Sequence, residues 1–147
     1  MSGSSDASFN EQYDHITNAY AILYPPDGSL NPTLPTSLVE EAQLRSAVDS
    51  IGGLCGKRIL ELACGAGHYS SKYLAWGAES VTGLDISSGM LDAARAQAKA
   101  GEVSESKLRF LLGDATDDSL VIEGGPFDVV MACWLLNYAP NAEAMAQ

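Results

Sequence analysis

Basic residues are scarce in this sequence, in which 8 lysines and arginines stand against 19 aspartates and glutamates in 147 residues. The formal net charge at pH 7 is therefore −11. Because an acidic surface repels phosphate groups, we expect no nucleic acid among its partners. Long apolar runs are absent as well, since none approaches the roughly 20 residues of a membrane-spanning helix. We therefore expect no membrane partner either.

Cysteine is also sparse, and the three residues Cys55, Cys64 and Cys133 form neither a CxxC pair nor a spacing typical of metal ligands. Their odd number and their spacing favour a reducing, cytoplasmic location and predict no metal site. The N-terminal residues lack the basic and apolar regions of a signal peptide, which agrees with that location. A hydrophobic content of 46% and a charged content of 18% are typical of one globular domain.

Residues 9–56 are predicted to form helices that precede the main domain and act as a lid or cap, after a disordered tail at residues 1–8. Residues 9–24 place apolar side chains at helical spacing, and a proline-rich loop follows them. Ser37 and Glu40 match a capping box, which predicts that a second helix begins there. The predicted apolar stripe of this second helix, and the glycines that end it, are Leu44, Ala47, Val48 and Ile51, then Gly52 and Gly53.

From residue 57 onward the pattern alternates between apolar strands and helices. Near-continuous apolar strands separated by helices are typical of a parallel sheet covered by helices. We therefore predict an α/β fold with a doubly wound, mostly parallel sheet as the core domain over residues 57–147. Strands are predicted at residues 57–64, 80–86, 107–114 and 126–136, and helices at residues 68–76 and 88–100.

The stretch LELACGAGHYS runs from a strand through a glycine-containing turn into a helix. Gly65 and Gly67 give the turn a GxG pattern, but Ser70 stands where a dinucleotide fingerprint has its third glycine. Glycine suits such a turn because the turn is tight and a ligand must approach its backbone closely. The other interpretation is a strand-to-helix turn that requires glycine and binds no ligand.

Acidic side chains stand where three consecutive predicted strands end. Glu61 precedes the glycine turn, Asp85 ends the second strand and Asp114 follows the third. In doubly wound sheets, ligands lie beyond the carboxyl ends of the strands. Asp85 is placed to accept hydrogen bonds from ribose hydroxyls, and Asp114 from an adenine amine. An acid at Glu61 would repel a pyrophosphate and suits a cationic group, so the set predicts a cationic, adenosine-bearing cofactor.

Four motifs, LELACGAGHYS, GLDIS, GDAT and FDVVMACWLLNY, resemble in order and spacing those of the class I S-adenosylmethionine-dependent methyltransferases. The E-x-x-x-G-x-G form from Glu61 to Gly67 is similar to the first motif of that family. The resemblance covers residues 57–140 and implies a Rossmann-like fold with S-adenosyl-L-methionine as the cofactor.

The resemblance also implies which residues hold each part of the cofactor. The methionine part is assigned to Glu61 and to the backbone of Ala63, Cys64, Gly65 and Gly67, and the ribose to Asp85. The adenine is assigned to Ile86, Met90, Asp114 and the Ala115 amide, the pocket wall to Cys133 and Trp134, and a lid to Tyr13 and Tyr20.

The implied activity is transfer of the sulfonium methyl group to a small-molecule acceptor, which the acidic composition favours over nucleic acid. Such a transfer depends on alignment and exclusion of water more than on a strong acid or base, so we assign no catalytic residue. The only imidazoles are those of His15 and His68.

The family's core sheet has seven strands, whereas four are predicted here, so the half that completes the acceptor pocket is expected to be missing. The fourth strand would then expose one edge, and a homodimer through this edge is one hypothesis. An alternative to an active enzyme is a non-catalytic remnant that binds the cofactor or a partner chain. A third hypothesis is a nicotinamide-dependent oxidoreductase, against which Ser70 and Glu61 both count.

Overall fold

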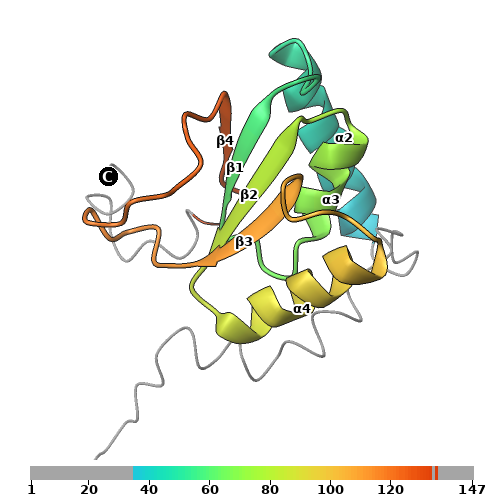
Figure 1. Ribbon diagram of the computed structural model, residues 1–147. Helices are drawn as coiled ribbons and strands as arrows, with labels where there is room; N and C mark the ends of the chain where they lie inside the picture. Colours follow the sequence, from blue (N-terminus) through green and yellow to red (C-terminus); the bar gives the residue numbers. More distant parts are fainter. Residues whose placement is uncertain (1–34, 134, 136–147) are drawn as a thin grey trace, which may run out of the picture.

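The computed structural model describes residues 35–133 and residue 135, and it places a parallel sheet with helices gathered on one side of it (Figure 1). Within these residues, no helix combines the length and the apolar character that crossing a membrane requires. The elements in chain order are α2 (Pro35–Ser50), β1 (Arg58–Leu62), α3 (His68–Ala75), β2 (Ser80–Asp85), α4 (Ser88–Ala100), β3 (Leu108–Leu112) and β4 (Val129–Met131).

The four strands lie in the order β3-β2-β1-β4, and every neighbouring pair is parallel. Leu60 of β1 is in register with Thr82 of β2 on one side and with Val130 of β4 on the other. The chain thus builds the sheet outward from β1 to β3 and then returns to the far side of β1. This reversal of strand order is the point at which doubly wound sheets bind ligands, at the carboxyl ends of the strands. The predicted α/β class with a parallel sheet is confirmed.

The hydrophobic core lies between the helices and one face of the sheet. It joins residues of α2, α3 and α4 to alternate residues of the strands, as the period of two along a strand requires. Its members include Val48 from α2, Tyr73 from α3, Leu91 and Ala94 from α4, and Ile59, Val81, Leu108 and Phe110 from the sheet.

Helix α2 differs from its prediction at its start. It begins at Pro35, two residues before the predicted cap at Ser37. Proline is favoured at the first helical position because its φ is already helical and it lacks an N–H that the first turn leaves unpaired. The predicted end is confirmed, since Gly53 adopts a φ of +81° and donates its N–H to the Val48 carbonyl at 3.0 Å.

The face by which α2 packs is narrower than the predicted stripe. Val48 is buried in the core and Leu44 packs against it, but Ala47 is exposed and Ile51, which lies beyond the helix end, is 48% exposed. Polar contacts to α3 supplement this small apolar face. One of them is an ion pair of 2.8 Å between Lys72 of α3 and Glu41 of α2.

Strand β4 is shorter than the predicted residues 126–136. Pairing with β1 starts at Asp128, which donates its N–H to the Arg58 carbonyl at 2.8 Å, while its Oδ2 accepts the Arg58 N–H at 2.8 Å. Pro126 lacks the N–H that a further ladder bond would need. Likewise, β3 covers Leu108–Leu112 rather than the predicted residues 107–114.

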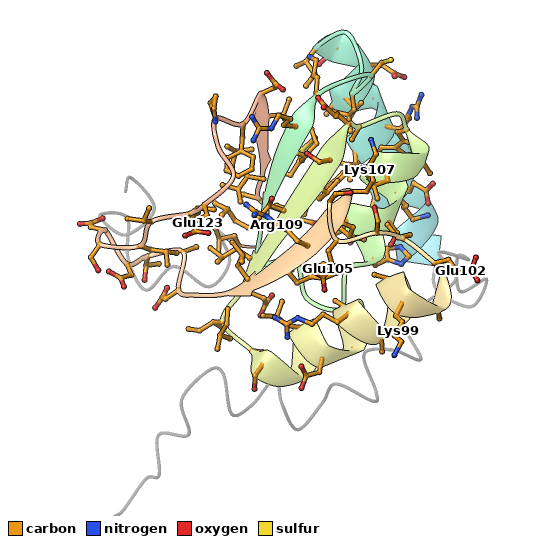
Figure 2. All side chains as sticks on the ribbon, viewed as in Figure 1. Lys99, Glu102, Glu105, Lys107, Arg109 and Glu123 are labelled. Atoms are coloured by element: carbon orange, nitrogen blue, oxygen red, sulfur yellow. The ribbon has the colours of Figure 1, made fainter. Side chains whose placement is uncertain are left out.

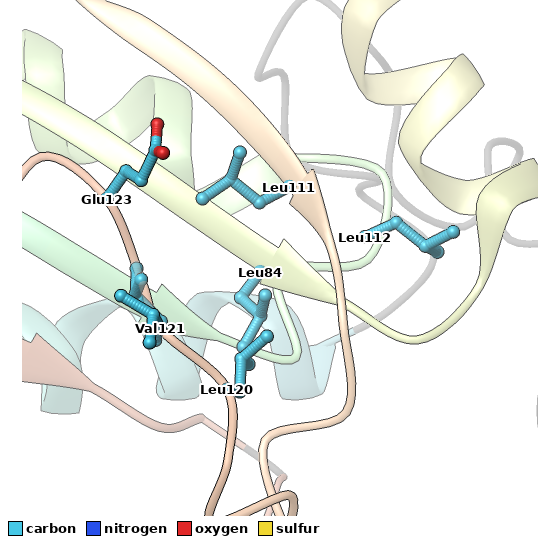
Figure 3. A pocket seen from close by; sticks show the side chains of 7 residues that line it. Leu84, Leu111, Leu112, Leu120, Val121 and Glu123 are labelled. Carbon is cyan, nitrogen blue, oxygen red and sulfur yellow. The ribbon is translucent and has the colours of Figure 1, made fainter.

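The loop between β3 and β4 crosses the sheet face that lies away from the helices. Arg109 of β3 donates from Nη2 to the Glu123 carbonyl and from Nε to Thr82 Oγ1 at 3.1 Å, and Figure 2 shows Arg109 and Glu123 together on this side. An apolar hollow lies beside this loop (Figure 3), lined by Leu84, Leu111, Leu112, Leu120, Val121, Ile122 and Glu123.

Candidate cofactor site

The residues after β1 form a tight turn at the carboxyl end of the sheet. Its backbone is left-handed at three positions, with φ of +54° at Ala63, +54° at Gly65 and +81° at Gly67. Between them, Cys64 donates its N–H to the Leu84 carbonyl of β2 at 3.0 Å. A left-handed conformation costs a non-glycine residue such as Ala63 about 1–2 kcal/mol. Strain of this kind is often retained where a backbone serves a site.

Gly67, which caps α3, has a packing role besides its conformation. A Cβ at this position would lie 3.0 Å from Cζ of Phe110 and 3.2 Å from Cβ of Ala94. The missing side chain therefore lets the start of α3 approach both β3 and α4. This is the helix–strand packing for which Rossmann-like turns use glycine.

Gly67→Ala is expected to lower the unfolding free energy by about 2–3 kcal/mol, because backbone strain and crowding against Phe110 add together. Gly52→Ala is the matched control, since Gly52 has a φ of +84° but nothing within 4 Å of the added Cβ. Urea unfolding followed by circular dichroism compares the two variants. Equal losses would show that crowding at Gly67 contributes nothing.

Asp85, the last residue of β2, ties the glycine turn to the start of α4. Its Oδ2 accepts the Gly65 N–H at 2.7 Å and its Oδ1 accepts the Ser87 N–H at 2.9 Å. Ser87 in turn caps α4, because its Oγ accepts the Met90 N–H at 3.2 Å. Hydrogen bonds to a carboxylate are stronger than neutral ones, so Asp85 fixes the turn in place.

Glu61 lies inside the protein rather than at its surface. It is 2% exposed, and Ser70 of α3 donates its hydroxyl to Oε2. Burial raises the pKa of Glu61 to about 8; the Ser70 hydrogen bond lowers this pKa, and the nearby Asp85 carboxylate raises it further. At pH 7 the Glu61 carboxyl is therefore mostly protonated.

Of the three acidic side chains expected at the carboxyl ends of the strands, Glu61 therefore carries no charge in most molecules at pH 7. The physical reason is desolvation, which a sequence pattern does not reveal. Asp85 carries the negative charge at the turn itself. Asp114 is exposed just beyond β3, where its Oδ1 accepts the Thr116 N–H at 2.8 Å.

The remaining predicted site residues differ in exposure and do not all lie at the glycine turn. Ile86 is exposed next to Asp85, and Ala115 is exposed next to Asp114, whereas Met90 is buried. Cys133 is half-buried after β4, with its Sγ 3.7 Å from the Tyr73 hydroxyl. The structure thus brings Glu61, Ala63, Cys64, Gly65, Gly67 and Asp85 together. Tyr13, Tyr20 and Trp134 lie outside the described residues.

Sequence reasoning missed the role of Ser70. The residue was interpreted only as a departure from a dinucleotide fingerprint, whereas the structure buries it and bonds it to Glu61. The signal was a hydroxyl residue in the first turn of the helix that follows an acidic strand end. That position faces the strand across the turn.

Fold and turn together define a class of proteins, the parallel α/β domains in which a glycine turn at the carboxyl ends of the strands receives a nucleotide-like cofactor. Residues 59–147, more than half of the chain, match the family described as Methyltransferase domain. The chain belongs to this methyltransferase family. The family that the sequence motifs resemble is thereby confirmed.

Individual relatives point the same way. A ubiquinone biosynthesis O-methyltransferase of Actinobacillus pleuropneumoniae is 26% identical over 136 residues, which cover 92% of this chain and 56% of that protein. A demethylmenaquinone methyltransferase of Renibacterium salmoninarum is 30% identical over 144 residues, which cover 97% of this chain and 56% of that protein. The chain thus spans about half the length of the curated relatives that it matches.

A solved structure supports the fold. It is an S-adenosylmethionine-dependent methyltransferase from Thiobacillus denitrificans in complex with S-adenosyl-L-homocysteine. The likeness has a TM-score of 0.58 and 22% sequence identity, and it covers 90% of this chain and 47% of that one. The predicted Rossmann-like fold is confirmed.

Proposed function

We propose that this chain is the cofactor-binding part of an S-adenosylmethionine-dependent methyltransferase that acts on a small-molecule acceptor. The observation that carries the proposal is that Glu61 and Asp85 both lie at the left-handed turn, in a chain of the methyltransferase family. A buried carboxyl and a carboxylate at a glycine turn match a ligand with a cationic end and a ribose. Ser70 stands where a dinucleotide fingerprint has its third glycine, which counts against the nicotinamide alternative.

The residues present fit S-adenosyl-L-methionine in their chemistry. Glu61 is a buried acid that forms no ion pair with any residue the structure describes, so a cationic ligand would supply its missing partner. Asp85 accepts a backbone N–H at each carboxylate oxygen, and because one carboxylate oxygen can accept more than one hydrogen bond, ribose hydroxyls are proposed as additional donors. Asp114 and the Ala115 amide are proposed for the adenine edge, beside Ile86.

The cofactor supplies the chemistry of the proposed reaction, an activated methyl group that passes to a nucleophilic atom of the acceptor. In this proposal, the residues of this chain bind the cofactor and orient it. The rigid turn fixes the position of the ligand, and Asp85 holds the turn. Orientation of this kind lowers the barrier by removing the entropy of bringing two reactants together.

The acceptor class is proposed from the relatives and from charge. The names of the matched enzymes contain ubiquinone biosynthesis and demethylmenaquinone, and a net charge of −11 disfavours a nucleic acid acceptor. A cytoplasmic location belongs to the proposal, supported by the free thiols of Cys55, Cys64 and Cys133.

A transfer assay tests the proposed activity. The chain is incubated with S-adenosylmethionine labelled in its methyl group and with small aromatic hydroxyl and quinol acceptors. Label in an extracted acceptor is the expected result, and Asp85→Ala should reduce it. Cofactor binding without transfer to any acceptor would favour the non-catalytic alternative.

We further propose that two copies associate through β4. This strand lies at one edge of the described sheet, and its Val130 is 56% exposed. Strand edges offer unpaired backbone groups to a second chain. Light scattering is expected to give the mass of two chains, and a monomer at micromolar concentration would refute the dimer.

A further inference from the structure

The Glu61 carboxyl lies in an unusual environment for an acidic side chain. Glu61 projects from β1 toward α3, where the Ser70 hydroxyl donates to it, and both side chains are almost completely buried. Within the described part of the chain, no lysine or arginine forms an ion pair with Glu61. The pair is therefore a buried acid held by one neutral donor.

Among the described groups that shift the pKa of Glu61, none carries a positive charge. Asp85, at the end of β2, contributes a negative one. Burial raises the pKa of the Cys64 thiol after β1, of the Tyr73 phenol on α3 and of the Cys133 thiol after β4, so all three are uncharged at pH 7. Ionisation of Glu61 would thus place a second negative charge beside Asp85 in a desolvated position.

We propose that Glu61 is a proton-linked specificity residue, which holds a proton until a cationic group of the cofactor enters the site and then releases it to solvent, while Ser70 positions the carboxyl. This inference rests on the proposed function and deepens it. The carboxyl O–H bond breaks, its electron pair stays on oxygen as the carboxylate, and the proton passes to the buffer. The carboxylate and the incoming cation then compensate each other.

The direction of this exchange follows from the charges. Without a cationic neighbour, burial holds the pKa of Glu61 at about 8, so the acid is neutral at pH 7. An opposite charge within about 4–6 Å favours the ionised form by one to three pKa units. Binding of a cation at pH 7 should therefore release roughly 0.4 to 0.9 of a proton per chain, depending on the size of this shift, whereas a ligand without a cationic group should release none.

Titration calorimetry in buffers of different ionisation enthalpy, such as phosphate and Tris, counts these protons. At pH 7 the wild-type chain is expected to release roughly 0.4 to 0.9 of a proton on binding S-adenosylmethionine. Glu61→Gln has no proton to release at position 61. Any proton that this variant releases on binding therefore comes from the ligand or from other groups, and it is subtracted as background. Glu79→Gln removes an exposed carboxyl from the opposite end of β2 and should match the wild type.

A second variant tests the role of Ser70. Because the Ser70 hydrogen bond lowers the pKa of Glu61, Ser70→Ala should raise it. The quantity compared is the number of protons released on ligand binding, minus the number that Glu61→Gln releases. At pH 8.5 this difference is expected to be small in the wild type and larger in Ser70→Ala. A merely structural role of Ser70 would change affinity without moving this pH dependence.

The outcomes separate the inference from the function on which it rests. Release with both S-adenosylmethionine and S-adenosylhomocysteine would identify the ammonium as the group that Glu61 senses, and release with the former alone would identify the sulfonium. Binding without proton release, or with equal release in Glu61→Gln, would overturn the inference alone. No binding of either compound to a folded chain would overturn the proposed function as well.

Discussion

Glu61→Gln is expected to remove most of a pH-dependent loss of folding stability. Burial raises the pKa of Glu61 from 4.5 to about 8, so the folded chain keeps a proton that the unfolded chain gives up. The resulting stabilisation is complete below pH 4.5 and is lost as the pH rises through 8. Between pH 5 and pH 8 the wild type should lose roughly 3 kcal/mol of unfolding free energy from this group. A neutral glutamine has no such dependence.

Urea unfolding at pH 5, 6, 7 and 8 measures the effect as a difference in slope, which is independent of how well the glutamine amide packs. Glu79→Gln is the control, because it removes a carboxyl that is exposed and should keep the wild-type slope. Parallel slopes for Glu61→Gln and the wild type would contradict the buried, protonated state. A flatter slope for Glu61→Gln than for the wild type, together with the proton count, would show that the buried acid lowers folding stability and serves binding.

Asp85→Ala is expected to weaken the fold and the cofactor site together. The substitution leaves the N–H groups of Gly65 and Ser87 without their charged acceptor, at about 1.5–3 kcal/mol for each bond. A total loss of roughly 3 kcal/mol or more of unfolding free energy should result. Affinity for S-adenosylhomocysteine should fall at least tenfold, because the proposed ribose bonds disappear as well.

Asp85→Asn separates the two roles. It keeps one carbonyl oxygen as an acceptor and should therefore retain part of the stability, while it still loses the charge and one acceptor. Unfolding and calorimetric titration of both variants give the comparison. Unchanged stability in Asp85→Ala would contradict the two backbone bonds, and unchanged affinity would contradict the ribose assignment.

The arrangement of strands and helices could be predicted from the sequence because local signals agree with the global fold. Helix α4 was predicted at residues 88–100 and is observed there, since its serine cap and Gly101 mark both ends. The long, apolar fourth strand was predicted too generously. The length of β4 depends on its pairing with β1, and this pairing starts at Asp128. A local sequence pattern does not reveal how distant segments pair.

The position of the candidate turn could be predicted from the sequence, but its electrostatics could not. The spacing of Glu61, Gly65 and Asp85 was sufficient to place these residues at one turn, because parallel strands end at the same edge of the sheet. The charge of Glu61 could not be predicted, because it depends on the residues that bury it from α3. Ser70 belongs to that set, and only the three-dimensional packing shows that it faces Glu61.

The central claim is that the turn around Asp85 and Glu61 binds S-adenosylmethionine and its product, and titration of the purified chain with S-adenosylhomocysteine tests it most directly. We expect saturable binding at one site per chain, in the micromolar range, that is weakened at least tenfold in Asp85→Ala and unaffected in Glu79→Gln. Circular dichroism of the same samples confirms that each chain is folded. A folded wild-type chain that gives no binding heat, or that binds equally well after Asp85→Ala, would contradict the account.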